Sequence, residues 1–450
     1  MTSIFAFGRL VIMYVALATL VPNLKNPRQH SARQIKQIAR SMKAFGFTVP
    51  ILVDRNNTII AGHGRFLAAQ FLELAEAPVI RLEHLSESEA KAFMIADNRL
   101  TEESLWDERL LAEALKELAE LELDFNIEAT GFTIGEIDLR IEGLNPDSND
   151  SHDQADTLPS PSTQNPVTQA GDLWRLRDHR VYCGNALDAG AYEILMQGKR
   201  ATMSFSDPPY NLKIDGHVSG LGRFRHREFA MASGEMNEGQ FKTFLTTAGS
   251  WIVRNSRDGS IHFMCTDWRH IGELLSAGKA VFSELLNLCV WTKHNAGMGS
   301  FYRSQHELIF VFKAGRGRHR NNIQLGQFGR NRSNIWSYPG MASFGRGGEE
   351  GNLASLHPTV KPVRLVADAI MDCSARGDIV LDPFLGSGTT VIAAERVGRI
   401  CYGMEIDPLY VDTIVRRWQA YSGETAFHAG TGMHFDDATA EVEARHVRAK

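Results

Sequence analysis

From residue 172 onward, the chain alternates between short apolar runs and longer stretches with helical periodicity. Such runs are typical of strands, and their alternation with helices predicts a mostly parallel sheet covered on both faces. In a sheet of this kind, ligands bind at the carboxyl ends of the strands. The strand signals fall at 181–184, 202–206, 260–265, 285–292, 308–312, 379–382 and 400–405, and helical stretches at 238–255, 268–278, 364–374 and 390–397 separate several of them.

The chain of 450 residues is long for a single domain, so we expect at least two. Residues 13–143 mix strand-like runs with helical periodicity and predict a small α/β domain, in which the acidic part 101–128 is an amphipathic helical extension. Residues 144–171 are rich in Asp, Ser, Pro, Gln and Asn, which predicts a flexible linker. The second domain is expected at 172–421, and the polar tail 422–450 is predicted to be disordered.

Composition excludes several classes of protein. A net charge of −5 argues against a protein that coats DNA by bulk positive charge. The five cysteines include no CxxC pair, so neither a metal site nor a disulfide framework is indicated, and we expect a cytoplasmic protein. The apolar segment 4–21 raises a targeting or membrane segment as an alternative. Because Gly8 and Arg9 interrupt it, we expect no membrane association and a first strand within 11–21.

One motif, Asp207-Pro208-Pro209-Tyr210, directly follows the apolar run 201–205. We interpret it as a loop that holds a primary aromatic amine at the end of a strand. Such a nitrogen is a poor nucleophile because its lone pair is delocalised into the ring. The Asp207 carboxylate and the Pro208 carbonyl can accept its two N–H bonds, while the prolines stiffen the loop. A surface turn is the alternative interpretation.

A second motif, Asp-Pro-Phe-Leu-Gly-Ser-Gly-Thr-Thr at 382–390, follows a predicted strand and opens a predicted helix. Gly386 and Gly388 permit a tight turn and close backbone approach to a bound nucleoside. Glu405 ends the next predicted strand, where an acid can accept hydrogen bonds from both ribose hydroxyls. A dehydrogenase is the competing interpretation, but the full GxGxxG pattern is absent from this segment.

Together the two motifs resemble those of the amino-group DNA methyltransferases, over about residues 171–421. The amine motif precedes the glycine motif, which is the order of the beta class, and the target-recognition part is then expected at about 211–356. The resemblance implies a Rossmann-like fold that uses S-adenosylmethionine, and a role in DNA modification of the restriction-modification kind. The residues that it places at the cofactor are Asn185, Ala186, Lys361, Asp382, Phe384, Gly386, Gly388, Thr389, Glu405 and Asp407.

The resemblance also implies a reaction and a substrate. The amine would belong to a base flipped out of double-stranded DNA and stacked on Tyr210. The leading Asp207 favours the 6-amino group of adenine, because cytosine-directed relatives more often carry Ser there. A methyltransferase acting on the 4-amino group of cytosine is one alternative, and a nucleotide-binding or DNA-binding protein with an inactive methyltransferase fold is another. Beta-class relatives are often dimeric, which makes a homodimer the expectation.

Positive charge is concentrated in two segments. Residues 313–332 contain six bases and no acid, and a second basic group follows the amine motif. Cationic segments rich in Gly, Asn and Gln suit contact with phosphates and base edges, whereas ordinary solvated loops are the alternative. The predicted DNA contacts are Arg223, Arg225, Arg316, Arg318, Arg320, Arg330 and Arg332.

The amino-terminal domain resembles the ParB/sulfiredoxin-like family over about residues 17–110. The resemblance rests on Asn26-Pro27-Arg28, Pro50-Ile51-Leu52-Val53 and Ile60-Ala61-Gly62-His63-Gly64-Arg65. In that family, the glycine-rich segment entering a helix binds nucleotide phosphates, which implies a nucleotide site at Gly62, His63, Gly64 and Arg65. No convincing helix-turn-helix is evident in the sequence.

Overall fold

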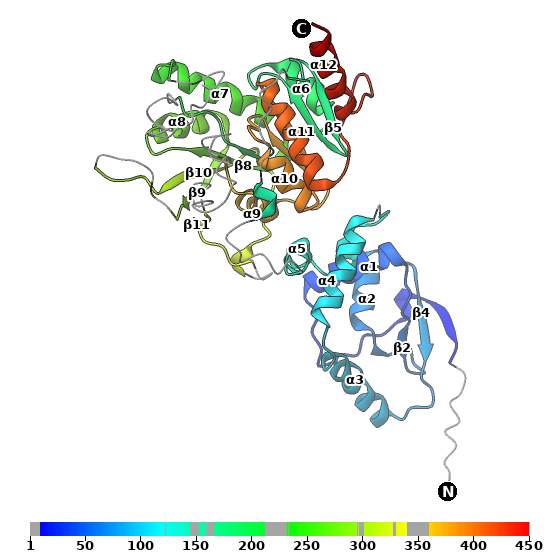
Figure 1. Ribbon diagram of the computed structural model, residues 1–450. Coiled ribbons are helices and arrows are strands. Elements are labelled where there is room, and N and C mark those ends of the chain that lie inside the picture. Colours follow the sequence, from blue (N-terminus) through cyan, green and yellow to red (C-terminus); the bar gives the residue numbers. More distant parts are fainter. Residues whose placement is uncertain are drawn as a thin grey trace. The chain divides into compact units, whose positions relative to one another are not determined.

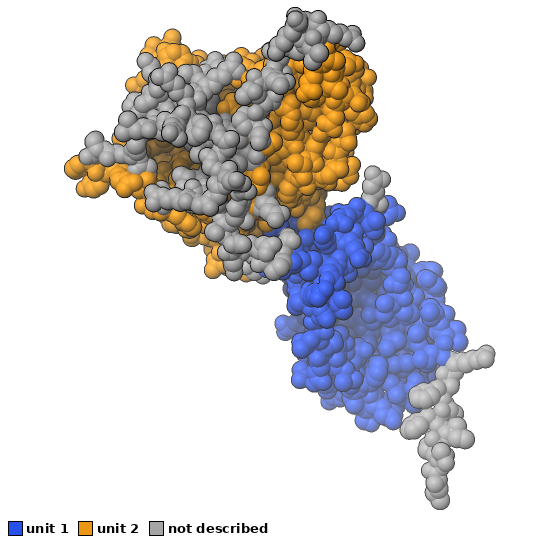
Figure 2. Space-filling view, viewed as in Figure 1, with its two compact units in different colours: residues 1–144 blue, residues 145–450 orange. Residues whose placement is uncertain are grey.

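The computed structural model describes residues 10–121, 123–144, 153–157, 159, 166–211, 232, 234–294, 296, 301–326, 330–339 and 360–449. The chain divides into two compact units, residues 1–144 (unit 1) and residues 145–450 (unit 2), which are coloured separately in Figure 2. Each unit has its own sheet and its own hydrophobic core.

Unit 1 is built on a four-stranded sheet in the order β1-β4-β2-β3. The middle pair, β4 and β2, is parallel, and the two outer pairs are antiparallel. Its core includes Ile51, Val53, Ile59, Phe66 and Val79. The elements are β1 (Ile12–Ala16), β2 (Ile51–Val53), β3 (Ile59–Ala61), β4 (Glu76–Arg81), α1 (Ala32–Phe45), α2 (His63–Phe71), α3 (Glu87–Glu102), α4 (Glu108–Glu120) and α5 (Ile134–Glu142).

The apolar segment near the amino terminus forms a strand, as predicted. β1 pairs with β4, and the short 3-10 turn Leu17–Thr19 follows it. Leu17 and Leu20 are buried in the core of unit 1, whereas Val11, Ile12 and Tyr14 are exposed. Throughout the part of the chain that the structure describes, no helix is both long enough and apolar enough to cross a membrane.

Unit 2 is built on a ten-stranded sheet in the order β11-β9-β10-β8-β7-β12-β13-β6-β5-β14. Its central strands β8, β7, β12, β13 and β6 are parallel. Antiparallel pairs extend the sheet on both sides, and the edge strand β11 is parallel to its neighbour β9. The strands are β5 (Leu173–Leu176), β6 (His179–Cys183), β7 (Ala201–Ser206), β8 (Ser256–Thr266), β9 (Glu284–Thr292), β10 (His306–Lys313), β11 (Ile335–Ser337), β12 (Ile379–Asp382), β13 (Ile400–Glu405) and β14 (Phe427–His428).

Helices cover both faces of this sheet because successive side chains of a strand point to opposite faces (Figure 1). On β12, Val380 packs in the cluster formed with α9, α10 and α11, whereas Leu381 packs in the cluster formed with α6. On β10, Phe310 packs with α7 and α8. The helices are α6 (Ala189–Met196), α7 (Glu238–Arg254), α8 (Ile271–Val281), α9 (Val363–Cys373), α10 (Thr389–Arg396), α11 (Pro408–Ser422) and α12 (Phe435–Ala449). The predicted fold class is therefore confirmed.

The prediction of a disordered tail after residue 421 is wrong. β14 pairs with β5, and α12 follows it. Phe435 anchors this segment, because it is 1% exposed and its ring lies 5.0 Å from that of Trp174 between centroids. The polar composition of the tail reflects the exposed side of α12, while Phe435 and Ala438 pack against the core of unit 2.

The described part of segment 144–171 is also fixed to unit 2, so it is not a free linker. Asp156 accepts a hydrogen bond from the Val363 amide at 2.7 Å, at the start of α9. Asp412 of α11 accepts bonds from the Val167 and Thr168 amides at 2.8 and 3.0 Å. The polar residues that suggested a solvated linker instead satisfy helix ends and buried charges.

Candidate active site

The two motifs meet at one edge of the unit 2 sheet. β7, β12, β13 and β6 are adjacent and parallel, so their carboxyl ends lie together. Asp207 directly follows β7, Asp382 ends β12, and Glu405 ends β13. The pKa of Asp382 is raised to about 7, mainly by burial and in part by the Asp207 carboxylate, which places the two motifs within electrostatic reach of each other.

The Asp207 carboxylate is held from two sides. The Tyr210 hydroxyl donates to Oδ1 at 2.6 Å, and the Lys361 ammonium donates to Oδ2. The Lys361 side chain is 4% exposed, and its Nζ lies 5.8 Å from the ring centroids of both Tyr210 and Trp291. Asp207 itself keeps one-fifth of its side chain exposed. A fixed carboxylate that remains reachable can accept an N–H from a bound amine.

A second carboxylate, Glu307 of β10, joins a charge cluster made of Asp207, Lys361, Glu307 and Lys293. Its Oε2 accepts bonds from Lys361 at 2.9 Å and from the Tyr210 hydroxyl at 3.3 Å, and its Oε1 pairs with Lys293. Burial raises the pKa of Glu307, but the two lysines outweigh this effect and lower it to about 2. Burial also raises the pKa of Asp207, and Lys361 opposes that rise. Two carboxylates and two ammonium groups balance each other within the cluster.

The turn after β12 has a backbone that favours glycine. Gly386 has φ 52°, and Gly388 has φ 84° and caps α10. A Cβ on Gly388 would lie 2.9 Å from a side chain of α11. Asp382 fastens this turn, because its Oδ1 accepts from the Phe384 amide at 3.0 Å and its Oδ2 accepts from the Thr390 hydroxyl at 2.6 Å. The turn is therefore rigid, and it brings backbone close to the sheet edge.

Glu405 contacts the glycine turn from the end of β13. Its Oε2 accepts from the Gly386 amide at 2.9 Å, and its Oε1 accepts from the Asp407 amide at 3.0 Å. Each carboxylate oxygen has two lone pairs, so each can accept a further hydrogen bond. Burial raises the pKa of Glu405 to about 7. Two adjacent acceptor oxygens of this kind fit the two hydroxyls of a ribose.

Several other predicted cofactor residues lie beside Glu405. The Gly184 amide donates to the Glu405 carbonyl at 3.0 Å, which brings Asn185 and the buried Ala186 to this corner of the sheet. Asp407 accepts from the Leu409 amide at 3.0 Å and caps α11. These residues surround Glu405 and hold the nearby backbone in place, Gly184 through its amide and Asp407 by capping α11.

Two predicted cofactor residues have other partners in the structure. The Thr389 hydroxyl accepts a bond from the buried Arg417 at 3.3 Å, so it helps to hold the glycine turn from the side of α11. Arg417 also donates to the Ser387 carbonyl of that turn at 3.1 Å. The Lys361 ammonium lies in the charge cluster with Asp207. The structure therefore places Lys361 with the amine loop and Thr389 behind the turn.

Arg330 and Arg332, which were predicted to contact DNA, have acidic partners within unit 2. Arg330 is 7% exposed, and its Nη2 lies 2.7 Å from Asp372 and 3.2 Å from Asp368 of α9. Arg332 pairs with the same carboxylates at 2.9 and 3.2 Å. Both guanidinium groups are neutralised within unit 2, where they fasten the segment before β11 to α9.

The exposed basic segment 316–320 lies at the opposite edge of the sheet from Asp207. It follows β10, which is antiparallel to β8, and Lys313 at the end of β10 pairs with Ile261 in the middle of β8. The Arg316 amide then donates to Asp258, near the start of β8, at 2.7 Å. The segment therefore lies near the amino ends of the parallel strands. Its arginines are Arg316, Arg318 and Arg320, whereas Arg223 and Arg225 are outside the described residues.

Replacing Arg330 by alanine is expected to lower the free energy of unfolding by about 3 kcal/mol, because Asp368 and Asp372 lose a buried partner. Chemical denaturation measures this change. The DNA affinity of the same variant should depend on salt concentration as the wild-type affinity does. If Arg330 contacted a phosphate, its loss would reduce the slope of log affinity against log salt concentration by about one.

In unit 1, the predicted nucleotide segment forms the start of α2. Gly62 caps the helix with a left-handed φ of 102°, and a Cβ on Gly64 would lie 2.9 Å from Ile38. Burial lowers the pKa of Arg65, and its Nε has no hydrogen-bond partner among the described residues. Burial also lowers the pKa of His63. A partly buried guanidinium beside a helix start favours an anion.

Comparisons with known proteins agree with this architecture. Residues 201–416 match the family model described as DNA methylase, residues 7–99 match the ParB N-terminal domain, and residues 109–170 match the ParB-methyltransferase HTH domain. The third match corrects the sequence interpretation, which found no helix-turn-helix. The described α-helices in that range are α4, apart from its first residue, and α5.

Individual relatives match one unit or the other. The chain is 43% identical over 81 residues to the ParB-like nuclease domain-containing protein YnaK of Escherichia coli (strain K12), covering 18% of this chain and 93% of YnaK. It is 25% identical over 270 residues to the Type II methyltransferase M2.MboI of Moraxella bovis, covering 54% of this chain and 88% of that protein. A solved structure, TTHA0409 of Thermus thermophilus complexed with S-adenosyl-L-methionine, is 22% identical over 54% of this chain and 94% of its own, with a TM-score of 0.37.

Unit 2, with an amine-binding loop and a glycine turn at one edge of its sheet, has the architecture of a DNA methylase. Residues 201–416 form a DNA methylase domain, and a ParB-type domain lies at residues 7–99.

Proposed function

We propose that the protein is a site-specific methyltransferase that moves a methyl group from S-adenosylmethionine to the exocyclic 6-amino group of an adenine flipped out of duplex DNA. The observation that carries this proposal is the Asp207 carboxylate. Tyr210 and Lys361 hold it at the sheet edge that also carries the glycine turn. The donor of a methyl group and its acceptor amine would meet at that edge.

The residues around the glycine turn fit S-adenosylmethionine. The backbone at Gly386 and Gly388 approaches the sheet edge closely, and the free acceptor sites of Glu405 suit the ribose hydroxyls. Asp382 would act by holding the turn, since both of its oxygens are used within it. When bound, the cofactor supplies a methyl group on a positively charged sulfur, and that sulfur leaves with the bonding electron pair.

The amine loop would prepare the nucleophile. The Asp207 carboxylate accepts one N–H of the amine, and we assign the second acceptor to the Pro208 carbonyl, so that the nitrogen lone pair faces the methyl carbon. The N–C bond forms as the C–S bond breaks, and the nitrogen then gives up a proton, for which Asp207 is the acceptor at the site. Tyr210 would provide the surface on which the flipped base stacks. Catalysis rests on position and electrostatics.

A transfer assay tests this proposal. Purified protein, DNA and cofactor with a tritiated methyl group are incubated, and the DNA is digested to nucleosides and separated. We expect label in N6-methyladenine, and sequencing that detects modified bases in DNA of an expressing host should then give the recognition site. Label in N4-methylcytosine would correct the target base, which the Asp207-led loop favours only by family resemblance. No label in DNA would refute the enzyme and leave a binding protein with an inactive methyltransferase fold.

Glu405→Gln is expected to weaken S-adenosylmethionine binding by about tenfold, because a neutral amide offers fewer acceptor sites to two hydroxyls. Isothermal titration calorimetry measures this change. Asp188→Asn, at the exposed cap of α6, is the matched control. Equal affinities for wild type and Glu405→Gln would argue against ribose binding at this carboxylate.

We also propose a nucleotide site at the start of α2 in unit 1. The observation that favours it is the partly buried Arg65, whose Nε has no partner among the described residues, beside the left-handed Gly62. Phosphate oxygens would satisfy this group and the amides of the first helical turn. Arg65→Gln should abolish binding of a fluorescent nucleoside triphosphate to the full chain. Binding that survives this change contradicts the assignment.

A further inference from the structure

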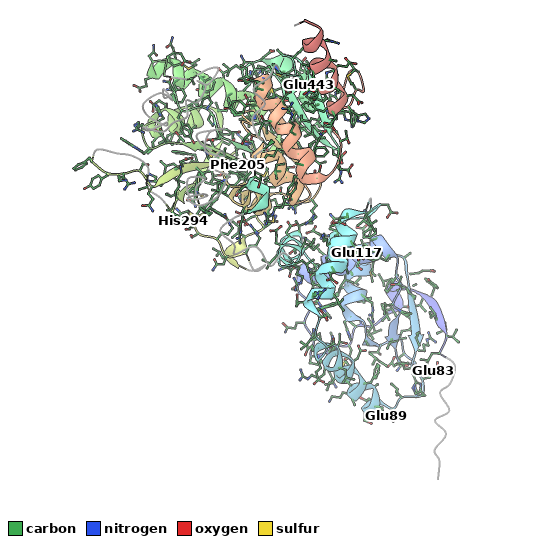
Figure 3. The ribbon with its side chains drawn as sticks, viewed as in Figure 1. Glu83, Glu89, Glu117, Phe205, His294 and Glu443 are labelled. Carbon is green, nitrogen blue, oxygen red and sulfur yellow. The ribbon has the colours of Figure 1, made fainter. Side chains whose placement is uncertain are left out.

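The connection between β9 and β10 leaves the sheet at the active-site edge. β10 is antiparallel to β8, and Leu308 near the start of β10 pairs with Thr266 at the carboxyl end of β8. The connection therefore projects from the same edge as Asp207. Figure 3 labels His294, which lies two residues beyond the end of β9.

The root of this hairpin is part of the active site. Lys293, directly after β9, pairs with Glu307 of β10. Glu307 in turn accepts bonds from Tyr210 and Lys361, which hold the Asp207 carboxylate. The hairpin therefore begins within the charge cluster, on the side of the sheet edge where the amine loop lies.

Hydrogen bonds continue along the hairpin beyond the strands. The Lys293 amide donates to the Gln305 carbonyl at 2.9 Å, and the Gln305 side chain donates to the Lys293 carbonyl at 2.8 Å. Further out, the Arg303 guanidinium donates to the Ala296 carbonyl at 2.9 Å. These hydrogen bonds link the two sides of the described part of the hairpin, and such links lower the entropy lost when a partner binds.

Two aromatic rings stand exposed on this hairpin. Phe301 and Tyr302 are 86% and 85% exposed, and their ring centroids lie 4.4 Å apart. A single exposed aromatic side chain is ordinary, but a pair on a projecting hairpin next to an active site is typical of a contact surface. Flat rings of this kind fit against unstacked bases.

The charge of the hairpin indicates the partner. Residues 293–306 contain Lys293, Arg303 and two histidines, and no acid. Arg303 and His294 are exposed beside the aromatic pair. Aromatic rings among cations complement the stacked bases and phosphates of DNA. The basic segment 316–320 lies at the opposite edge of the sheet and does not compete for this role.

We infer that Phe301 and Tyr302 form a wedge that enters the base stack of duplex DNA beside the target base and fills the space that base leaves, while Arg303 contacts the adjacent phosphate. This inference rests on the proposed function. Flipping costs the stacking and pairing of one base, and a wedge that replaces the lost stacking lowers that cost. The wedge should therefore raise the rate of methylation only when the target base is paired before it is flipped.

The test compares two duplexes that contain the recognition site, one fully paired and one with the target base mismatched and hence already destabilised. The double variant Phe301→Ala/Tyr302→Ala is expected to methylate the paired duplex about tenfold or more slowly than wild type, and the mismatched duplex at a similar rate. Tyr421→Ala, which removes an exposed aromatic ring near the end of α11, is the matched control. Unchanged affinity for S-adenosylmethionine shows that the variant is folded.

An equal loss of rate on both duplexes, or no loss on either, overturns the wedge. A change of oligomeric state in the double variant, with unchanged methylation, would overturn it as well and assign the rings to a contact between copies of the chain. The wild-type protein distinguishes failure of the wedge from failure of the proposed methyltransferase function. If it labels neither duplex, the proposed function fails and the wedge fails with it, whereas labelling of both by wild type leaves the variant to decide.

Discussion

Purified Asp207→Ala protein is expected to bind S-adenosylmethionine as tightly as wild type and to transfer methyl groups roughly 10³-fold more slowly or not at all. The substitution removes the acceptor and the negative charge that the amine requires in the transition state. Cofactor binding should persist because the hydrogen bonds that join Asp382 and Glu405 to the glycine turn do not involve Asp207.

The fold should tolerate this change. Lys361 loses one carboxylate but stays 2.9 Å from Glu307, so no buried charge is left alone. Asp178→Ala is the matched control, since Asp178 is exposed in the turn before β6, at the other end of that parallel strand. Tritiated-methyl transfer at saturating cofactor gives the rate, and calorimetry gives the affinity. Undiminished transfer by Asp207→Ala contradicts the role of the amine loop.

The sequence predicts those parts of the site that are formed by residues adjacent to one another in the chain. The strands at 379–382 and 400–405 have the predicted bounds, because each is a short apolar run that ends in an acid. The strand-to-turn-to-helix order around Gly386 and Gly388 follows equally from local residues. Because adjacent strands of a parallel sheet run in the same direction, their carboxyl ends lie together, and this follows from the predicted fold class alone.

The parts that could not be predicted depend on partners far apart in the chain. Lys293 and Glu307 are ordinary charges in the sequence, and only the β9–β10 register brings them together. Arg330 and Arg332 sit in a basic segment that suggested DNA contact, yet α9 supplies their carboxylates from much further along the chain. Phe435 is one apolar residue in a polar tail. Composition describes a segment, whereas burial depends on what packs against it.

Lys361→Met and Glu307→Gln are expected to shift the pH dependence of methyl transfer in opposite directions. Asp207 must be ionised to accept an N–H, so activity is lost as the pH falls through its pKa. Burial raises the pKa of Asp207, the Lys361 charge lowers it, the Glu307 charge raises it, and the Tyr210 hydroxyl bond lowers it. Removing the cation should therefore move the acid limb of the rate profile to higher pH, and removing the second anion should move it to lower pH.

The Lys361→Met effect should be the larger. Without the ammonium, the carboxylates of Asp207 and Glu307 share a site with no cation between them, and one of them takes up a proton. A protonated Asp207 no longer accepts the amine, so kcat near neutral pH should fall roughly 10²-fold to 10³-fold. Glu307→Gln keeps the Lys361 pair with Asp207 and should lower kcat by about tenfold through looser positioning of that lysine.

Rate profiles for wild type, Lys361→Met, Lys361→Arg and Glu307→Gln, each at saturating cofactor and DNA, provide the measurement. Lys361→Arg keeps the charge and should return the acid limb toward its wild-type position even if geometry costs some rate. A merely structural role for the cluster would lower all rates without moving the limb. Parallel shifts of Lys361→Met and Glu307→Gln in one direction would show that Asp207 does not set the limb, because the two removed charges have opposite signs.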